Sequence, residues 1–199
     1  MFGVTILFFR NTEVNDMAYF NSRDIAVIAL LSALWGVLNS IFSPIVFSMF
    51  GLPILCDMIG FTVLSVTVWW VRRLGAASIV GLIATVINFI FNPGGIFFLG
   101  FTAASIVFDI AAWLLRYDFY FKKTYLTAIS LFSVSVLSAA VAGFIIGTYF
   151  MAAPALAKWG GVLGWAGLHA IGGVIGGLIG IALVAGLTAR GIRGIDTKR

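Results

Sequence analysis

Three ionisable side chains lie within long apolar stretches of the sequence: Asp57, Asp109 and His169. Such groups are costly inside a membrane, so each is a functional candidate that needs a partner. Asp57 and His169 could serve as a general acid and base if their side chains come within hydrogen-bond reach. Asp109 shares a helix face with Arg116, about two turns further on. We therefore expect Asp109 to pair with Arg116 or with a neighbouring helix rather than with a ligand.

Uncharged polar and aromatic side chains form a second group of candidates. Asn88 and Asn92 belong to the run NFIFNPGG, and Asn39 lies in the first apolar stretch. Aromatic faces combined with a few directional amides suit a flat, neutral or weakly basic heterocycle, which stacks and forms hydrogen bonds. We predict a substrate pocket made by Asn39, Asp57, Asn88, Asn92, Phe98, Trp165 and His169.

The sequence lacks the short motifs of several common chemistries. It has no Gly-x-x-x-x-Gly-Lys-Ser/Thr phosphate loop, so it does not hydrolyse ATP by that route. It has neither His-Glu-x-x-His nor Cys-x-x-Cys, and its single cysteine, Cys56, has no partner for an internal disulfide. We expect no metal, no cofactor and no enzymatic activity.

The elements that position these residues are predicted to be membrane helices. The chain has 199 residues, of which 62% are hydrophobic and only 10% charged. Soluble domains carry about a quarter charged residues, so this chain could not cover a water-facing surface. Crossing a bilayer takes about 20 apolar residues. We predict an all-α integral membrane protein, a bundle of six transmembrane helices near residues 24–48, 53–71, 75–91, 95–115, 124–151 and 161–189.

The distribution of basic residues sets the predicted topology. With six crossings, eleven of the twelve cations fall on one side of the membrane, and only Lys158 falls on the other. Basic loops are cytoplasmic, so we predict that both termini are cytoplasmic and that the charge needs no nucleic-acid partner. Residues 1–22 are predicted as an N-terminal tail, 23–190 as the transmembrane domain and 191–199 as a basic tail.

Small residues recur at every fourth position along three of these stretches. In membranes such rows let helix backbones approach closely, so they mark contact faces. The rows Ser135, Ala139, Gly143, Gly147 and Gly172, Gly176, Gly180 are interpreted as packing faces inside the bundle, and Ala29 with Ala33 as a docking face.

Three local patterns resemble a known family. They are Gly75-Ala76-Ala77, the turn Asn92-Pro93-Gly94-Gly95, and Asp109 seven residues before Arg116-Tyr117. With six short helices and Ala29 and Ala33 on the first, the chain resembles the substrate-binding S components of energy-coupling factor (ECF) vitamin transporters. Within that group it is most similar to those assigned to the thiamine precursor hydroxymethylpyrimidine. It departs from them in its third stretch, where Gly81, Ile87 and Asn88 occupy a region that carries glutamates in the family.

The resemblance implies a substrate-capture subunit in the cell membrane. Such a subunit binds a vitamin-like small molecule from outside, topples in the bilayer, and releases it when docked on a transmembrane T subunit driven by two ATPases. Ala29 and Ala33 match the family's docking ridge. Two alternatives stay open: a membrane enzyme that uses Asp57 and His169, and a structural subunit whose polar groups only join helices.

Overall fold

The computed structural model describes residues 19–117, 121, 123–192 and 194. These residues are helical, and no strand occurs among them. Most of the two predicted tails lies outside the described residues. The helices are α1 (Ser22–Phe50), α2 (Ile54–Val71), α3 (Ala76–Phe91), α4 (Phe98–Leu114), α6 (Thr124–Tyr149), α7 (Ala153–Ala157) and α8 (Gly161–Ala189).

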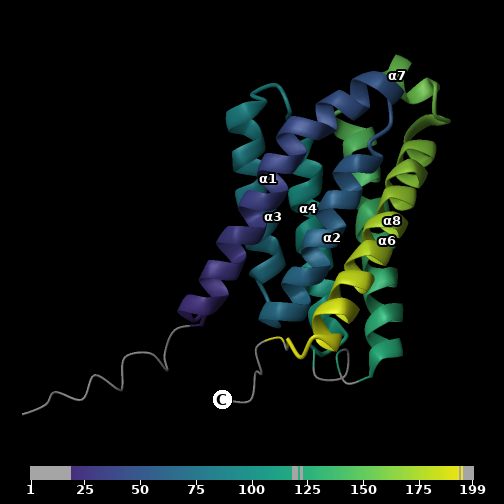
Figure 1. Ribbon diagram of the computed structural model, residues 1–199. Coiled ribbons are helices and arrows are strands. Elements are labelled where there is room, and N and C mark those ends of the chain that lie inside the picture. The colour runs from purple at the N-terminus through teal and green to yellow at the C-terminus, as the bar shows by residue number, and fades with distance from the viewer. Residues whose placement is uncertain (1–18, 118–120, 122, 193, 195–199) are drawn as a thin grey trace, which may run out of the picture.

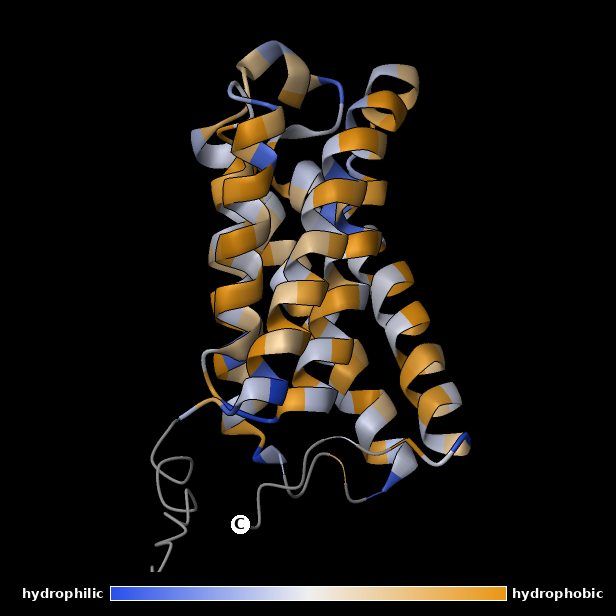
Figure 2. Ribbon diagram, turned by 60° about the vertical axis from the view of Figure 1, so that its left-hand side comes forward, coloured by the Kyte–Doolittle hydropathy of each residue, from blue (hydrophilic) through white to orange (hydrophobic). Residues whose placement is uncertain are grey.

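The length and the surface of the helices are those of a membrane protein. Helices α1, α2, α6 and α8 are long and apolar enough to cross a bilayer, and α3 and α4 are shorter apolar helices. Outward-facing side chains are large and hydrophobic: Leu30, Ile90 and Leu163 are 69%, 71% and 77% exposed. Figure 2 shows such residues along the length of the helices, with hydrophilic ones mainly toward the ends. An apolar surface this extensive requires lipid around it, and the chain is a membrane-embedded helical protein.

Local sequence signals explain the boundaries of α1. Asn21 Oδ1 accepts a hydrogen bond from the Asp24 backbone N–H at 2.9 Å, and Asp24 Oδ2 accepts one from the Asn21 N–H at 3.0 Å. This reciprocal pair is a capping box, which satisfies free donors at the helix start. The helix ends at Gly51, whose φ of 68° suits glycine. Its 29 residues span about 44 Å, and Figure 1 shows it slanting across its neighbours.

The helices alternate in direction and pack around α2. The start of α1 and the end of α8 lie at one end of the bundle, here called the terminal end (Figure 1). The α3–α4 connection and α7 lie at the other end, here called the turn end. Around the bundle the neighbouring pairs are α1–α3, α3–α4, α4–α6, α6–α8, α8–α2 and α2–α1. Helix α2 also contacts α3, α4 and α6, which makes it the central element.

Candidate functional site

A carboxylate–imidazole pair lies in the interior near the turn end. His169 Nδ1 of α8 is 3.0 Å from Asp57 Oδ1 and 2.9 Å from Asp57 Oδ2, in the first turn of α2. Both side chains are buried, at 1% and 0% exposure. The hydrogen-bond reach required for joint chemistry by these two residues is therefore present. A carboxylate in a first helical turn is also favoured by the helix dipole.

Glycines allow the three helices around this pair to come close. A Cβ atom at Gly172 would lie 2.5 Å from Asp57 Cβ, and one at Gly143 would lie 2.7 Å from His169 Cβ. On the other side of α8, a Cβ at Gly173 would lie 2.5 Å from Ala139 Cβ on α6. Contacts this short are not tolerated, so α8 approaches α2 and α6 only because these positions lack side chains. The predicted packing role of the small residues on α6 and α8 is confirmed.

Two ring nitrogens near the pair have no hydrogen-bond partner among the described residues. They are His169 Nε2 and Trp165 Nε1, both buried. The two rings meet edge to face, with centroids 5.6 Å apart, and Phe101 packs against His169 at 5.7 Å. Since Asp57 contacts Nδ1 of the imidazole, Nε2 is the ring nitrogen available to a ligand. Unpaired buried polar atoms are costly, which marks both as candidate ligand contacts.

A pocket of about 450 Å³ opens beside these rings. Its walls come from the last turns of α1, the start of α2, the α3–α4 turn and α4, α6 and α8. Phe98, Phe101, Trp165 and His169 supply aromatic surface, and Asn92, Ser43 and Cys56 add polar atoms. The volume falls within the usual range for small-molecule sites. The pocket lies at the turn end, since it includes the α3–α4 turn and Ala155 of α7.

The turn at Asn92 shapes one wall of the pocket. Asn92 N–H donates to Asn88 O at 2.7 Å, which ends α3, and Gly95 N–H donates to Asn92 O at 2.9 Å, which closes the turn. A Cβ at Gly95 would lie 3.0 Å from the Phe98 ring, so glycine lets that ring pack on the turn. The turn predicted from Asn-Pro-Gly-Gly is confirmed, with Asn92 and Phe98 both in the pocket wall.

Asn39 and Asn88 occupy a different place from the one predicted. Asn39 Nδ2 donates to Asn88 Oδ1 at 3.3 Å, and Ser40 Oγ lies 3.0 Å from the same oxygen. These bonds join α1 to α3, and the described residues that line the pocket include neither asparagine. Ser43 links the two regions, because its hydroxyl donates to Asn39 Oδ1 at 2.6 Å while its side chain lines the pocket. The two asparagines thus lie outside the pocket, and Asn39 contacts its wall through Ser43.

Asp109 caps a helix. Its Oδ2 accepts hydrogen bonds from the backbone N–H groups of Gly75 and Ser78 at 2.8 and 2.9 Å, and from Ser78 Oγ at 2.8 Å. The first turn of a helix leaves N–H groups unpaired, and this carboxylate satisfies those at the start of α3. The predicted pairing with a neighbouring helix is confirmed. No ion pair joins Asp109 to Arg116 within the described part of the chain.

Some parts of the site are absent from the predicted set. Phe47 and Pro44 at the end of α1, Cys56 on α2 and the short helix α7 all contribute to the pocket. One signal was present, since Asn39, Ser43 and Phe47 follow one another at helical spacing. Ala29 and Ala33, predicted to dock a partner, are exposed on the outer side of α1. No group of three or more His, Cys, Asp or Glu side chains able to hold a metal ion gathers within the described ranges.

Comparisons with protein-family models, with curated proteins and with solved structures gave no match to this chain. The site therefore has to be interpreted from its own geometry. It combines an aromatic pocket, a buried acid–imidazole pair and two unpaired ring nitrogens. Of the pair, His169 lines the pocket, whereas Asp57, predicted as a pocket residue, is not among the described lining residues.

Proposed function

We propose that this protein is the substrate-capture subunit of an ECF-type importer for a vitamin or vitamin precursor, with thiamine or its hydroxymethylpyrimidine moiety favoured. The observation that carries the proposal is the aromatic pocket of about 450 Å³ that includes His169 held by Asp57. Such a pocket at one end of a membrane bundle suits capture of a small heterocycle from one side of the membrane.

The proposed topology has six crossings, with both termini in the cytoplasm. Two features support it: the helices alternate in direction, and the ends of α1 and α8 lie together (Figure 1). Arg72 and Arg73 follow α2, and Arg116 follows α4, which places these cations at the same end. Basic residues collect on the cytoplasmic side of membrane proteins. The pocket at the turn end would then face outward.

The unpaired nitrogens suggest how a ligand would be recognised. Trp165 Nε1–H is only a donor, so it calls for an acceptor on the ligand. If Asp57 holds the imidazole proton on Nδ1, His169 Nε2 of the neutral ring is an acceptor, so it calls for a ligand donor. An aminopyrimidine presents a ring nitrogen beside an amino group, which supplies that acceptor and that donor on one edge. Phe98 and Phe101 offer faces on which such a ring would stack.

The energy for import would come from partner subunits. The chain has no phosphate loop, so we propose that a transmembrane T subunit and two ATPases drive its toppling and the release of ligand. Ala29 and Ala33 support a docking face on α1, because both are exposed and neither blocks a close helix approach.

Binding to the purified full-length chain tests this function. Hydroxymethylpyrimidine and thiamine should quench Trp165 fluorescence saturably, whereas riboflavin and biotin should not. The matched control is Trp113→Phe, which removes an exposed tryptophan of α4 and should leave the quenching intact. Trp165→Phe should abolish it. If none of the four compounds binds saturably, the proposal is refuted.

A membrane enzyme is a second candidate, favoured by the direct contact between Asp57 and His169. A carboxylate that orients an imidazole leaves Nε2 free to act as a general base, as in nucleophile activation. Cys56 and Ser43 line the same pocket. Chemical change of the bound compound over hours, abolished in His169→Gln, would favour the enzyme, and recovery of the intact compound would favour the transport subunit.

A further inference from the structure

Three arginines line an open hollow at the terminal end of the bundle. The hollow measures about 530 Å³, and Arg72, Arg73 and Arg116 line it together with Trp113, Leu114 and Tyr117. We name it the arginine hollow. The arginines come from two connections, since Arg72 and Arg73 follow α2 and Arg116 follows α4. It is separate from the pocket at the turn end and shares no lining residue with it.

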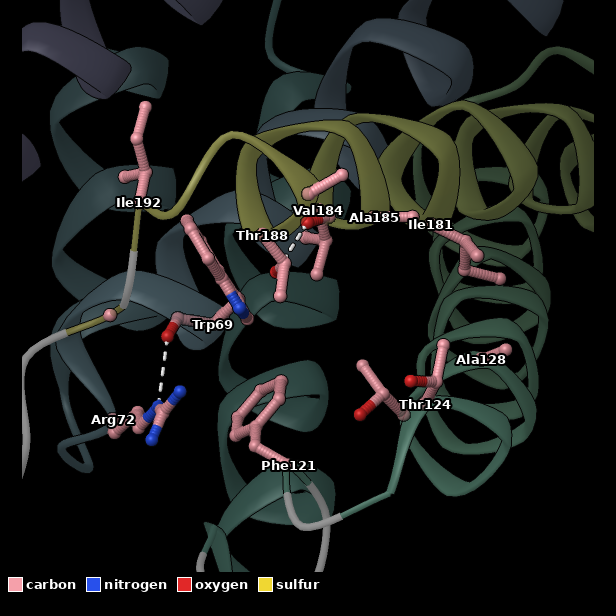
Figure 3. A pocket seen from close by; sticks show the side chains of 13 residues that line it. Trp69, Arg72, Phe121, Thr124, Ala128, Ile181, Val184, Ala185, Thr188 and Ile192 are labelled. Carbon is pink, nitrogen blue, oxygen red and sulfur yellow. Dashed lines mark hydrogen bonds between the residues drawn. The ribbon is translucent and has the colours of Figure 1, made fainter.

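Neighbouring groups hold two of the guanidinium groups in place. Arg72 Nε donates to Trp69 O at 3.0 Å, and its guanidinium lies 4.7 Å from the centroid of the Phe121 ring. Figure 3 shows Arg72 with these two aromatic residues at the edge of an adjoining cavity. Arg73 lies 3.7 Å from the buried carboxylate of Asp24. Fixed guanidinium groups are ready-made donors for a phosphate, because little side-chain freedom is lost on binding.

Backbone strain falls at the same place. Arg72 and Arg116 have φ values of 52° and 59°, and they are the two residues other than glycine with positive φ in the described part of the chain. Glycine is usual at such helix ends, because a side chain is strained there. A cation at a helix C-terminus is favourable in itself, which would account for one arginine at each end. It does not account for Arg73, which lines the same hollow.

Two apolar residues that line the hollow are exposed. Trp113 and Leu114 are 50% and 66% exposed, and they lie three and two positions before Arg116 in the chain. A hollow lined by cations and by exposed apolar residues matches the two parts of a phospholipid. Basic pockets at the ends of membrane helices bind anionic headgroups in this way, and tryptophan is typical of the interface.

We propose that the arginine hollow binds an anionic phospholipid, with the phosphate on Arg73 and Arg116 and the acyl chains along Trp113 and Leu114. Asp24 offsets part of the charge on Arg73, and Arg116 adds a second cation to the lining of the hollow. The proposal does not depend on the ligand of the pocket at the turn end.

Lipid retention by the full-length protein tests the site. The purified chain is mixed with phosphatidylglycerol or with phosphatidylcholine of the same acyl chains, and retained lipid is counted by native mass spectrometry. Phosphatidylglycerol should be retained in preference. Arg116→Gln should lower its affinity about fivefold, the effect of one cation at an anionic lipid surface. Arg190→Gln removes the same charge from the exposed end of α8, outside the hollow, and should have no comparable effect.

A conservative variant and a competition experiment complete the test of the lipid site. Arg116→Lys keeps the charge and loses the two-pronged geometry, so its affinity should lie between those of wild type and Arg116→Gln. Arg116 is exposed, so its substitutions should leave folding intact and the test informative. Equal retention of the two lipids, or equal losses in Arg116→Gln and Arg190→Gln, would overturn the proposal. So would full displacement of the lipid by about 10 mM inorganic phosphate, a concentration that reveals millimolar binding, because the hollow would then be a small-anion site.

Discussion

The contact between Gly172 and Asp57 allows a sharp test of the site. In Gly172→Ala, the new Cβ would lie 2.5 Å from Asp57 Cβ and 2.8 Å from Asp57 Oδ2. Ordinary carbon contacts need about 3.5 Å or more, so α2 and α8 must separate by roughly 1 Å. The distances from His169 Nδ1 to Asp57, now 2.9 and 3.0 Å, would then rise to about 4 Å, beyond hydrogen-bond range.

Two measurable losses should follow. Overpacking of this kind costs about 1–3 kcal/mol of unfolding free energy, which appears as a lower thermal midpoint in detergent. Loss of the Asp57 contact frees the imidazole to change tautomer and orientation. If a bound hydroxymethylpyrimidine uses Nε2, its affinity should fall about 2- to 10-fold, the effect of losing one hydrogen bond between neutral groups.

Gly167→Ala is the matched control for this substitution. It adds the same methyl group to the same helix, but nothing lies within 4 Å of the new atom. The gain in helix propensity, up to about 1 kcal/mol, is common to both variants. Equal thermal midpoints and equal affinities in the two variants would refute the packing argument for the Asp57–His169 pair.

Three other predictions concern separate parts of the bundle. Asp109→Ala removes the cap of α3 and should lower the unfolding free energy by about 2 kcal/mol, measured by thermal unfolding, whereas Asp109→Asn keeps an acceptor oxygen and should lose less. Asn88→Leu should lower the unfolding free energy by about 1 kcal/mol in the same assay, yet reduce ligand affinity less than Gly172→Ala does. A larger loss of affinity than in Gly172→Ala would show that Asn88 contacts the ligand. Ala33→Phe should keep ligand binding but abolish vitamin uptake and co-purification with a T subunit, whereas Leu34→Phe should spare both; loss of ligand binding in Ala33→Phe would contradict a purely docking role.

Much of the helical framework was predictable from local signals. The predicted stretches 53–71 and 75–91 match α2 and α3 to within a residue at each end, because proline and glycine mark their limits. Helix α1 extends two residues past its predicted end, to a glycine cap. The short helix α7 was not predicted, since five residues that begin with Ala153-Pro154 carry no periodic pattern.

The contacts within the site were harder to predict. Asp57 and His169 are 112 positions apart, and only the packing of α8 on α2 brings them together. From the sequence, this pair was considered only as the condition for an enzyme, because a buried charge needs a partner but the sequence does not show which groups meet. Asn39 and Asn88 show the opposite case: both were predicted to line the pocket, yet their amides meet each other between α1 and α3. Spacing along one helix does not reveal which neighbour occupies its other face.

The glycines of α8 carry a consequence for recognising related chains. Gly172-Gly173 and Gly176-Gly177 form a doublet repeated after four positions, with one member of each doublet against α2 and the other against α6. Any chain that keeps this three-helix junction must leave those places without side chains. The string His-x-x-Gly-Gly-x-x-Gly-Gly, combined with an aspartate early in the second helix, is therefore a fingerprint by which distant homologues can be sought.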